Sequence, residues 1–443
     1  MIIILHIIFI MFLNSKQQYA LECIKNKKTI FLTGSPGTGK SYTLKEIINY
    51  LKLENINYAV TSSTGCSAVL INGQTIHSYM NLGIGQIQKD TIIKKLKANK
   101  RYNTIKTLEC LIIDEISMID NYTFDSISSI FKEIKGVNEP FGGIQLIIVG
   151  DFCQLSPVSG DYCFKSDEWK NINPQIIILN ELMRQKDDMK LQSILQEVRL
   201  GKCSKNTFKE LKKLQNTQFD NIKPTKLFSL LSNVDKINAE EYSKLFKKTF
   251  HIPIEKGIIT ECFPYVKESE IDFELLTTSS NGQIYKYNAV SNDQKNKLSE
   301  YTINLFVGLQ VMVTRNISVE KGLINGTIGI ITTLTNEYVG ITDKYNNNHK
   351  IFYHKDVNEN TKTYIKFMPI KLAYAMSIHK SQGATLDAIE IDGGVFIFAP
   401  GQLYTAISRA KNLESIKLID IDKDSFICNK DVKKFYEEIT ERE

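Results

Sequence analysis

The feature that most constrains the fold of this chain is the loop GSPGTGKS at residues 34–41, which matches the pattern G-x-x-x-x-G-K-[ST]. Residues 28–33 directly before it read as a short buried strand, and apolar residues at helical spacing follow it from 44 to 51. Glycines let backbone N–H groups surround a phosphate, and a helix N-terminus adds the positive end of its dipole. The sequence therefore predicts a nucleoside triphosphate site on an α/β sheet.

The side chains at the end of this loop suit the chemistry of a triphosphate. Lys40 is predicted to reach the β- and γ-phosphates, and the Ser41 hydroxyl is predicted to be a ligand of Mg²⁺. ATP and Mg²⁺ are thus the predicted cofactors. The predicted nucleotide-contacting residues of this segment are Gly34, Ser35, Pro36, Gly37, Thr38, Gly39, Lys40, Ser41 and Tyr42.

A second apolar run, LIIDEISMID at residues 111–120, contains the acidic pair Asp114 and Glu115. Open α/β sheets place ligands at the carboxyl ends of their strands. An acidic pair after an apolar run is equally typical of a solvated strand end, so the phosphate loop upstream decides the interpretation. In that context the pair is predicted to be a Walker B motif. Asp114 would be a Mg²⁺ ligand, and Glu115 would orient and deprotonate the attacking water.

Two glutamines are candidates for sensing the nucleotide. Gln154 follows the buried-strand pattern IQLIIVG at 144–150, and a carboxamide there can bond the γ-phosphate or the attacking water. Taken alone, Gln154 reads more readily as a loop residue. Gln17 lies about one helix before the phosphate loop, and a carboxamide can pair with both N6 and N7 of adenine. Gln17 is therefore a candidate selector for ATP.

The second half of the chain predicts another parallel α/β core. Strand-like runs occur at 226–232, 388–392 and 416–420, and helical patterns such as residues 233–246 separate them. This half has no phosphate loop of its own. A motor needs two cores that ATP can draw together, and the alternation of strands and helices supplies the second one.

Phosphoryl transfer needs positive charge on the γ-phosphate in the transition state, and an arginine from a facing domain can supply it. Arg409 lies in GQLYTAISRAKNL, residues 401–413, where apolar spacing predicts a helix. Arg184 lies in LNELMRQKD, residues 179–187, at the junction of the halves. An isolated helical arginine is usually solvated. Together with the phosphate loop, both arginines are predicted to be catalytic.

The stretch SIHKSQG, residues 377–383, places His379, Lys380 and Gln382 close together before a strand of the second core. The stretch VTSSTGCSAVLINGQTIHSYMNLG, residues 60–83, occupies the comparable place in the first core. Both contain short hydroxyl side chains, glycine and one histidine, the groups that contact phosphate and sugar. Both are interpreted as grips on one strand of a nucleic acid.

Composition adds limits to the function. A net charge of +6 fits a polyanionic partner. Eight scattered cysteines without a C-x-x-C pair predict a reducing, intracellular compartment, nucleus or cytoplasm rather than secretion, and disfavour a zinc site. The apolar residues 1–12 are too few to span a bilayer and lack a basic segment before them. They are expected to be a non-native extension, and no membrane partner is expected.

The motifs resemble those of superfamily-one helicases of the RecD/petite-integration-frequency (PIF) branch, and most closely the PIF group. The resemblance covers about residues 13–420. It implies an α/β fold of two RecA-like P-loop cores with parallel sheets flanked by helices, a small insertion in the first core and an SH3-like β-barrel insertion in the second. The motifs that carry it are TGSPGTGKS, SSTGCSAVLINGQTIHS, LIIDEISMID, PFGGIQLIIVGDFCQLSPV, LNELMRQKD, GLINGTIGII, SIHKSQGATLD and GQLYTAISRA.

The resemblance also implies domain bounds. The basic run at 94–106 reads by charge alone as a solvated helix face, but by position it matches the small insertion. Residues 308–357 are rich in strand formers, and Asn325–Gly326 predicts a hairpin turn. The implied segments are the extension at 1–12, the first core at 13–180 with an insertion at about 84–108, the second core at 181–300 and 368–443, and the SH3-like insertion at 301–367.

By resemblance, the chain is expected to hydrolyse ATP, to translocate 5′ to 3′ on single-stranded DNA, and to unwind forked DNA as a monomer. Replication, repair, recombination and telomere maintenance are the implied processes. The residues carried over for ATP are Gln17, Lys40, Ser41, Asp114, Glu115, Gln154, Arg184, Gln382 and Arg409. Those carried over for DNA are Thr64, Gly65, His77, Asn316, His379 and Lys380.

Two other functions compete with a DNA helicase. An RNA helicase or translocase of the same superfamily would also use backbone grips, so RNA is an alternative partner. A nucleic-acid-binding protein that ATP switches without unwinding is the second alternative. Glu115 and Arg409 disfavour the switch, because a switch does not need fast hydrolysis.

Overall fold

The computed structural model describes two compact units. The first comprises Met1–Glu210, Ile397–Ser408 and Asp422–Glu443, and the second comprises Leu211–Phe396 and Arg409–Ile421. The bounds inferred for the two cores stay a prediction, and the proposed extension at 1–12 lies outside the described residues. The structure describes residues 13–441 except 83–87, 99–100, 182–187, 220–222, 251–284, 292–297, 316, 319–322, 324, 344 and 359–362.

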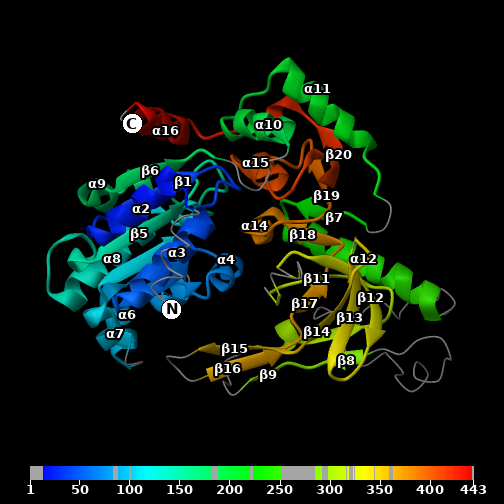
Figure 1. Cartoon of the computed structure of the whole chain (residues 1–443), viewed down its shortest axis with the longest axis horizontal. Coiled ribbons are helices and arrows are strands. Elements are labelled where there is room, and N and C mark those ends of the chain that lie inside the picture. The colour runs from blue at the N-terminus through cyan, green and yellow to red at the C-terminus, as the bar shows by residue number, and fades with distance from the viewer. Residues whose placement is uncertain are drawn as a thin grey trace. The chain divides into compact units, whose positions relative to one another are not determined.

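A six-stranded parallel sheet organises the first unit, with the strand order β3-β2-β4-β5-β1-β6 (Figure 1). Its strands are β1 (Ile30–Gly34), β2 (Tyr58–Ser62), β3 (Gln74–Thr75), β4 (Cys110–Asp114), β5 (Gln145–Gly150) and β6 (Gln175–Leu179). Every residue of β1 and β4 is buried, because helices cover both faces of a parallel sheet. The first predicted α/β core is confirmed.

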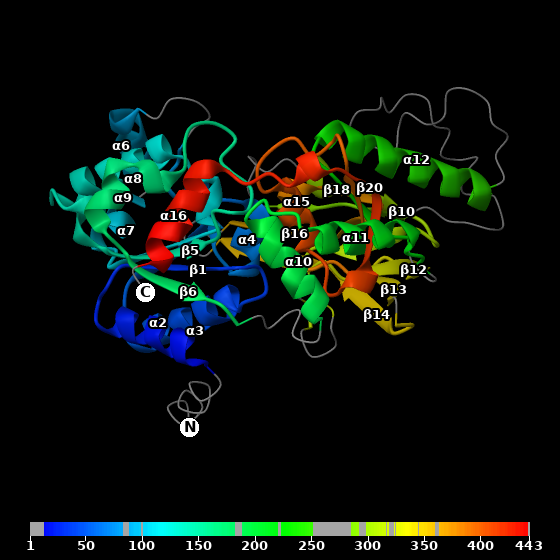
Figure 2. The same cartoon turned by 90° about the horizontal axis from the view of Figure 1, so that it is seen from above.

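Alternate residues of β1 face opposite helical layers. Ile30 and Leu32 join an apolar cluster with α2 (Ser15–Lys25) and α3 (Lys40–Leu53). Phe31 between them packs on Trp169, with ring centroids 5.3 Å apart. Figure 2 shows α2 and α3 on one side of the sheet and α8, α9 and α16 on the other. The phosphate loop therefore leaves a strand that is fixed from both sides.

The other helices of the first unit include two that carry the basic insertion, α6 and α7. Apolar side chains of α6 are buried while its lysines are exposed. No helix in the described part of the chain is both long and apolar enough to cross a bilayer. The bounds are α4 (Gly65–Leu70), α5 (Ile76–Tyr79), α6 (Lys89–Ala98), α7 (Arg101–Thr107), α8 (Asn121–Lys135), α9 (Asp167–Ile172), α10 (Met189–Arg199), α15 (Gln402–Ile407) and α16 (Lys430–Thr440), while α11 (Lys205–Lys213) spans the boundary of the two units.

The second unit contains a second parallel sheet, with the order β18-β7-β19-β20. Its strands are β7 (Thr225–Phe228), β18 (Ala375–Ser377), β19 (Ile389–Gly393) and β20 (Ile416–Ile421), and its helices include α12 (Leu231–Phe250) and α14 (Ile378–Ser381). The second predicted core is confirmed. One boundary is corrected, because the strand predicted at 226–232 ends at Phe228 and its last two residues, 231–232, begin α12.

The helix predicted over 401–413 is shorter than its apolar spacing suggested. It ends at Ile407, and Ala410 instead forms a parallel bridge with Leu386. The Leu386 N–H donates to the Arg409 carbonyl oxygen at 3.0 Å. Tertiary pairing thus satisfies the backbone that a longer helix would have used. Arg409 follows the helix instead of lying within it.

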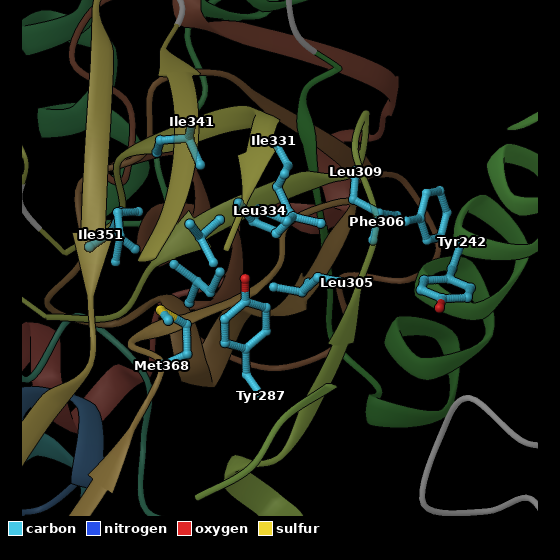
Figure 3. Close-up of a cluster of buried hydrophobic side chains, with 14 of the residues drawn as sticks. Tyr242, Tyr287, Leu305, Phe306, Leu309, Ile331, Leu334, Ile341, Ile351 and Met368 are labelled. Carbon is cyan, nitrogen blue, oxygen red and sulfur yellow. The ribbon is translucent and has the colours of Figure 1, made fainter. Parts of the chain in front are cut away.

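An antiparallel sheet, in the order β14-β13-β12-β11-β17, fills the predicted β-rich insertion. Its core joins Tyr287, Leu305 and Ile341, and Tyr242 of α12 packs on Phe306 at 5.1 Å between ring centroids (Figure 3). The SH3-like assignment of this insertion stays a prediction. The strands of this sheet are β11 (Gln310–Val313), β12 (Ile328–Leu334), β13 (Tyr338–Asp343), β14 (Asn348–Phe352) and β17 (Ile370–Leu372). Two smaller sheets contain β8 (Tyr285–Tyr287) with β10 (Ile303–Leu305), and β15 (His354–Asn358) with β16 (Thr363–Phe367) and β9 (Val290–Ser291).

The hairpin predicted at Asn325–Gly326 is not a two-residue turn. Strands β11 and β12 do pair antiparallel, but residues 314–327 connect them. Gly326 has a φ of +96°, and a Cβ there would lie 2.3 Å from the Thr385 carbonyl oxygen. The glycine is needed for a close approach of two backbones rather than for a tight hairpin.

Candidate nucleotide and nucleic-acid site

The phosphate loop joins β1 to α3 through three glycines with positive φ angles. Gly34, Gly37 and Gly39 have φ values of 144°, 86° and 89°. A Cβ on Gly34 would lie 2.3 Å from the Leu179 carbonyl oxygen of the neighbouring strand β6. Gly39 begins α3 without a side-chain cap, so the first N–H groups of the helix are placed to receive an anion.

Lys40 lies across its own loop and faces negative charge. Its Nζ donates to the carbonyl oxygens of Gly34 at 2.6 Å and Ser35 at 3.1 Å. Burial lowers the pKa of the Lys40 ammonium group, and three nearby carboxylates act in the opposite direction. These belong to Asp151, Glu115 and Asp114. The predicted lysine and the predicted Walker B pair therefore converge on one place.

The rest of the loop presents both fixed and exposed groups. Thr38 is buried, and its hydroxyl donates to the Ser35 carbonyl oxygen at 2.8 Å. Ser41 and Tyr42 are exposed at the first turn of α3. The exposed Ser41 hydroxyl is thus accessible to a ligand.

The Walker B pair stands at the carboxyl end of β4. Burial, together with the charge of Glu115, raises the pKa of Asp114 to about 7. The Glu115 N–H donates to the Asp114 carboxylate at 2.9 Å, which opposes that rise. Glu115 has φ 51° and ψ 46°, a left-handed conformation that costs energy in any residue with a side chain. Strain of this kind is typical of functional sites.

Two serines of residues 60–83, the segment predicted to contact a nucleic-acid strand, form hydrogen bonds with the backbone of the Walker B pair. The Ser62 hydroxyl donates to the Asp114 carbonyl oxygen at 3.3 Å, and the Ser63 hydroxyl donates to the Glu115 carbonyl oxygen at 2.7 Å. The Ser63 N–H also donates to the Asp114 carbonyl oxygen, at 3.1 Å. The segment predicted to contact nucleic acid is therefore hydrogen-bonded to the backbone of the two residues whose carboxylates are predicted to be catalytic.

The three nucleic-acid candidates of the first unit follow β2 and β3. Thr64 is half-buried and its hydroxyl bonds the Ser67 hydroxyl. Gly65 is exposed at the start of α4, and His77 is exposed in α5. Their positions leave them accessible to a ligand at this end of the sheet.

Both predicted nucleotide-sensing glutamines are buried with one amide atom unused. Gln17 accepts the Asn14 N–H at 3.0 Å, but its Nε2 has no hydrogen-bond partner among the described residues. Gln154 likewise has an Oε1 without a partner within the described part of the chain. A buried unpaired amide is costly, which is why such atoms point to a ligand. A Cβ on Gly401, before α15, would lie 2.3 Å from the Gln154 carbonyl oxygen.

The predicted ATP residues of the second unit lie near each other. Arg409 is buried, and its Nη1 donates to the carbonyl oxygens of Ser381 and Ala384, each at 3.3 Å. Gln382, also buried, lies between those two residues in the chain. The structure therefore groups the predicted arginine finger with the end of the SIHKSQG stretch.

The strand-gripping candidates of the second unit begin α14. The Ser377 hydroxyl accepts the Lys380 N–H at 3.2 Å and caps this helix. Burial lowers the pKa of His379, which favours the neutral imidazole, while the Lys380 side chain is exposed. Arg184 and Asn316 lie outside the described residues.

Two groups escaped the sequence interpretation. Ser63 lies in the hydroxyl-rich segment 60–83, which the sequence links to nucleic-acid binding and not to the Walker B pair. Asp151 follows β5 and stands three residues before Gln154, yet it was given no role. The structure shows that Asp151 is buried and near enough to Lys40 for the lysine charge to help lower the Asp151 pKa. An acidic residue directly after a buried strand, as at Asp114, was the available signal.

Two family models match parts of this chain. The family model of the PIF1-like helicase matches residues 12–209, and the model of the DNA helicase Pif1 2B domain matches residues 294–334. The chain belongs to the PIF1-like helicase family. The ATP-dependent DNA helicase PIF1 of Homo sapiens is 32% identical over 96% of this chain and 63% of its own length. The chain thus spans less than two thirds of that relative.

Solved Pif1 structures share the fold. The Pif1 helicase from Candida albicans is 28% identical with a TM-score of 0.74, covering 96% of this chain and 99% of that one. Bacteroides Pif1 in complex with ADP-AlF4 is 25% identical with a TM-score of 0.76, covering 97% of both chains. A Pif1 structure that addresses unwinding of forked dsDNA is 25% identical with a TM-score of 0.63, covering 97% and 98%.

Proposed function

We propose that this chain is an ATP-dependent DNA helicase. The observation that carries the proposal is the position of Lys40, bonded to the phosphate loop and facing three carboxylates at the ends of neighbouring parallel strands. Membership of the PIF1-like family supports the same function. The name of the Homo sapiens relative and the ADP-AlF4 complex support ATP as the substrate, and the structure that addresses forked dsDNA supports forked DNA as the partner.

The first unit would bind and orient ATP. Lys40 would leave the loop carbonyls for the β- and γ-phosphates, and the glycine-rich backbone would enclose them. Glu115 would accept a proton from the attacking water. The unpaired Gln154 Oε1 is an acceptor, so it suits the hydrogens of that water better than a phosphate oxygen. The unpaired Gln17 Nε2 is a donor that suits N7 of adenine.

We propose that Ser41 and Asp114 hold Mg²⁺. Both offer hard oxygen donors, and Mg²⁺ is usually bound by one or two protein oxygens together with phosphates. When bound, Mg²⁺ would neutralise charge that develops on the phosphate oxygens.

The second unit would supply the remaining groups. Arg409, with Arg184, would stabilise the charge of the transition state, and Gln382 would contact the nucleotide. His379 and Lys380 would grip the DNA backbone together with Thr64, Gly65, His77 and Asn316. Travel from 5′ to 3′, action as a monomer in replication, repair, recombination or telomere maintenance, and a nuclear or cytoplasmic site belong to the same proposal.

The test is steady-state ATP hydrolysis without nucleic acid, with single-stranded DNA and with single-stranded RNA of the same sequence. We expect stimulation by DNA, and unwinding of a 5′-tailed but not a 3′-tailed duplex. Lys40→Ala and Arg409→Ala should each lower DNA-stimulated turnover by about 10³-fold or more. The control Lys45→Ala, exposed on the same helix as Lys40, should match the parent chain.

Other outcomes would reject parts of the proposal. Equal or stronger stimulation of ATP hydrolysis by RNA would show that the protein acts on RNA. Hydrolysis without unwinding of either duplex would favour an ATP-switched binding protein. Turnover that persists in both Lys40→Ala and Arg409→Ala would refute the site.

A further inference from the structure

A buried cluster of four polar side chains lies beside the phosphate loop. The Asp151 cluster consists of Asp151 after β5, Arg199 at the end of α10, Tyr404 in α15 and Tyr436 in α16. The guanidinium of Arg199 donates from Nε to Oδ2 at 3.1 Å and from Nη2 to Oδ1 at 3.0 Å. The hydroxyls of Tyr404 and Tyr436 donate to Oδ2 and Oδ1, each at 3.0 Å.

The charges of this cluster are matched inside the protein. Arg199 holds the pKa of Asp151 below its usual value, although burial alone would raise that pKa. The guanidinium of Arg199 also lies 4.3 Å from the centre of the Tyr436 ring. A bidentate arginine–carboxylate pair of this kind fixes the relative orientation of the two side chains and balances their charges. Three helices from distant parts of the chain are thereby bonded to one carboxylate.

The cluster contacts the phosphate loop on both sides. Tyr436 gives its proton to Asp151, so its oxygen accepts from the Thr33 hydroxyl at 2.7 Å and from the Phe152 N–H at 3.1 Å. Thr33 directly precedes Gly34. On the other side, burial raises the pKa of the Tyr404 hydroxyl, and the nearby Ser35 side chain opposes that rise. Tyr436 is thus bonded to the residue immediately before the first glycine of the loop, and Tyr404 lies close to the residue immediately after it.

Helix α15 connects the cluster to the proposed arginine finger along the chain. Tyr404 lies in its centre, the helix ends at Ile407, and Arg409 follows two residues later. Gly401 at the start of α15 approaches the Gln154 backbone. The N-cap and the centre of this short helix are therefore held beside the Gln154 backbone and the Asp151 carboxylate, respectively.

We propose that Tyr404 and Arg199, acting through Asp151, are positioning residues for ATP hydrolysis. They set the phosphate loop and α15 in one geometry, in which Lys40 and the segment leading to Arg409 are aligned for the transition state. The inference rests on the proposed function of Lys40 and Arg409. Apolar side chains could have filled a core of this size, whereas this arrangement fixes hydrogen-bond directions next to the loop.

Tyr404→Phe tests the inference because it removes one hydroxyl and keeps the shape of the ring. Turnover with saturating single-stranded DNA should fall about tenfold or more, since small misplacements of reacting groups cost up to about 10²-fold. The KM for ATP should stay within about threefold, because ground-state contacts with ATP remain. Arg199→Lys keeps the charge without the two-pronged contact and should show the same separation of kcat from KM.

The matched control is Tyr374→Phe in the second unit. Tyr374 is a buried tyrosine whose hydroxyl accepts the Gln310 N–H at 2.9 Å, and it has no proposed role in binding ATP or DNA. Its loss should leave kcat within about twofold of the parent chain. Thermal unfolding of each variant shows whether a fall in turnover merely follows a fall in stability.

The outcomes distinguish failure of the positioning role from failure of the proposed function. If Tyr404→Phe keeps kcat within twofold while Lys40→Ala abolishes turnover, the positioning role is wrong and the proposed site stands. If the loss in Tyr404→Phe matches that in Tyr374→Phe at an equal fall in Tm, the cluster is only structural and the inference also fails. If Lys40→Ala retains turnover, the proposed function itself is wrong.

Discussion

Backbone constraint at single residues shapes the candidate site. Glu115 adopts a left-handed conformation that a side chain disfavours, and the hydroxyl of Ser63 holds its carbonyl oxygen there. Gly34 shows the opposite solution, because its position admits no side chain at all. At Glu115 the backbone is strained and the carboxylate is held in one direction. At Gly34 the absence of a Cβ removes the strain.

Gly34→Ala should destabilise the first unit. The new Cβ would meet the Leu179 carbonyl oxygen at 2.3 Å, and backbone cannot move aside as a flexible side chain can. We expect a loss of about 1–3 kcal/mol in the free energy of unfolding, with weaker ATP binding. Gly65→Ala is the stability control, because its Cβ would meet nothing within 4 Å and alanine favours the helix α4. Chemical denaturation measures both; equal stability of the two variants would contradict the described loop.

At the scale of elements, α16 is joined to the sheet by rings as well as by Tyr436. Phe435 stacks on Phe164 with centroids 4.5 Å apart and meets Phe152 edge to face at 5.4 Å. The ring centroid of Phe31 in β1 lies 6.2 Å from that of Phe435. A helix from the end of the described chain thus completes the covering of the face opposite α2 and α3.

Phe435→Ala should cost the first unit about 3 kcal/mol, because it removes a large ring from several aromatic contacts. The adjacent Lys434 supplies the control. Its side chain is exposed and pairs with Glu438 at 3.8 Å within the helix, so Lys434→Ala should change stability by at most about 0.5 kcal/mol. A urea titration followed by circular dichroism measures both. A similar loss in the two variants would show that α16 is not docked by its aromatic face.

Local patterns predicted part of this fold, and tertiary contacts decided the rest. The glycine-rich loop and the apolar runs of β1, β4 and β5 are local, so the sequence located them. The shortened α15 was not predictable, because Ala410 leaves its helix for a bridge with Leu386, 24 positions earlier in the chain. Asp151 was undervalued for the same reason, since its partners lie on helices 48 to 285 positions away.

At the scale of the whole molecule, the two units are interleaved along the chain. The boundary between them is crossed after Glu210, Phe396, Ser408 and Ile421. The net charge of +6 acts across both units, and the binding of a polyanion should therefore weaken as salt is added. Part of that salt dependence should come from identifiable lysines.

Lys380→Ala should lower the affinity for single-stranded DNA and also its salt dependence. One lost phosphate contact reduces the slope of log K against log salt by about 0.7 for a single strand. Fluorescence anisotropy between about 50 and 200 mM salt measures the slope. Lys434→Ala also removes one positive charge but lies on α16, so its slope should equal that of the parent chain. An unchanged slope in Lys380→Ala would remove Lys380 from the DNA contact.

The bond between Thr33 and Tyr436 has a consequence for how the protein is made. These residues stand 403 positions apart, yet they meet beside the first sheet. During synthesis a ribosome releases the strands of that sheet long before it releases α16. The aromatic face and the carboxylate of Asp151 must therefore wait, partly uncovered, until residue 436 emerges. The newly made chain needs protection from aggregation during that interval, and the first unit matures only after residue 436 has been released.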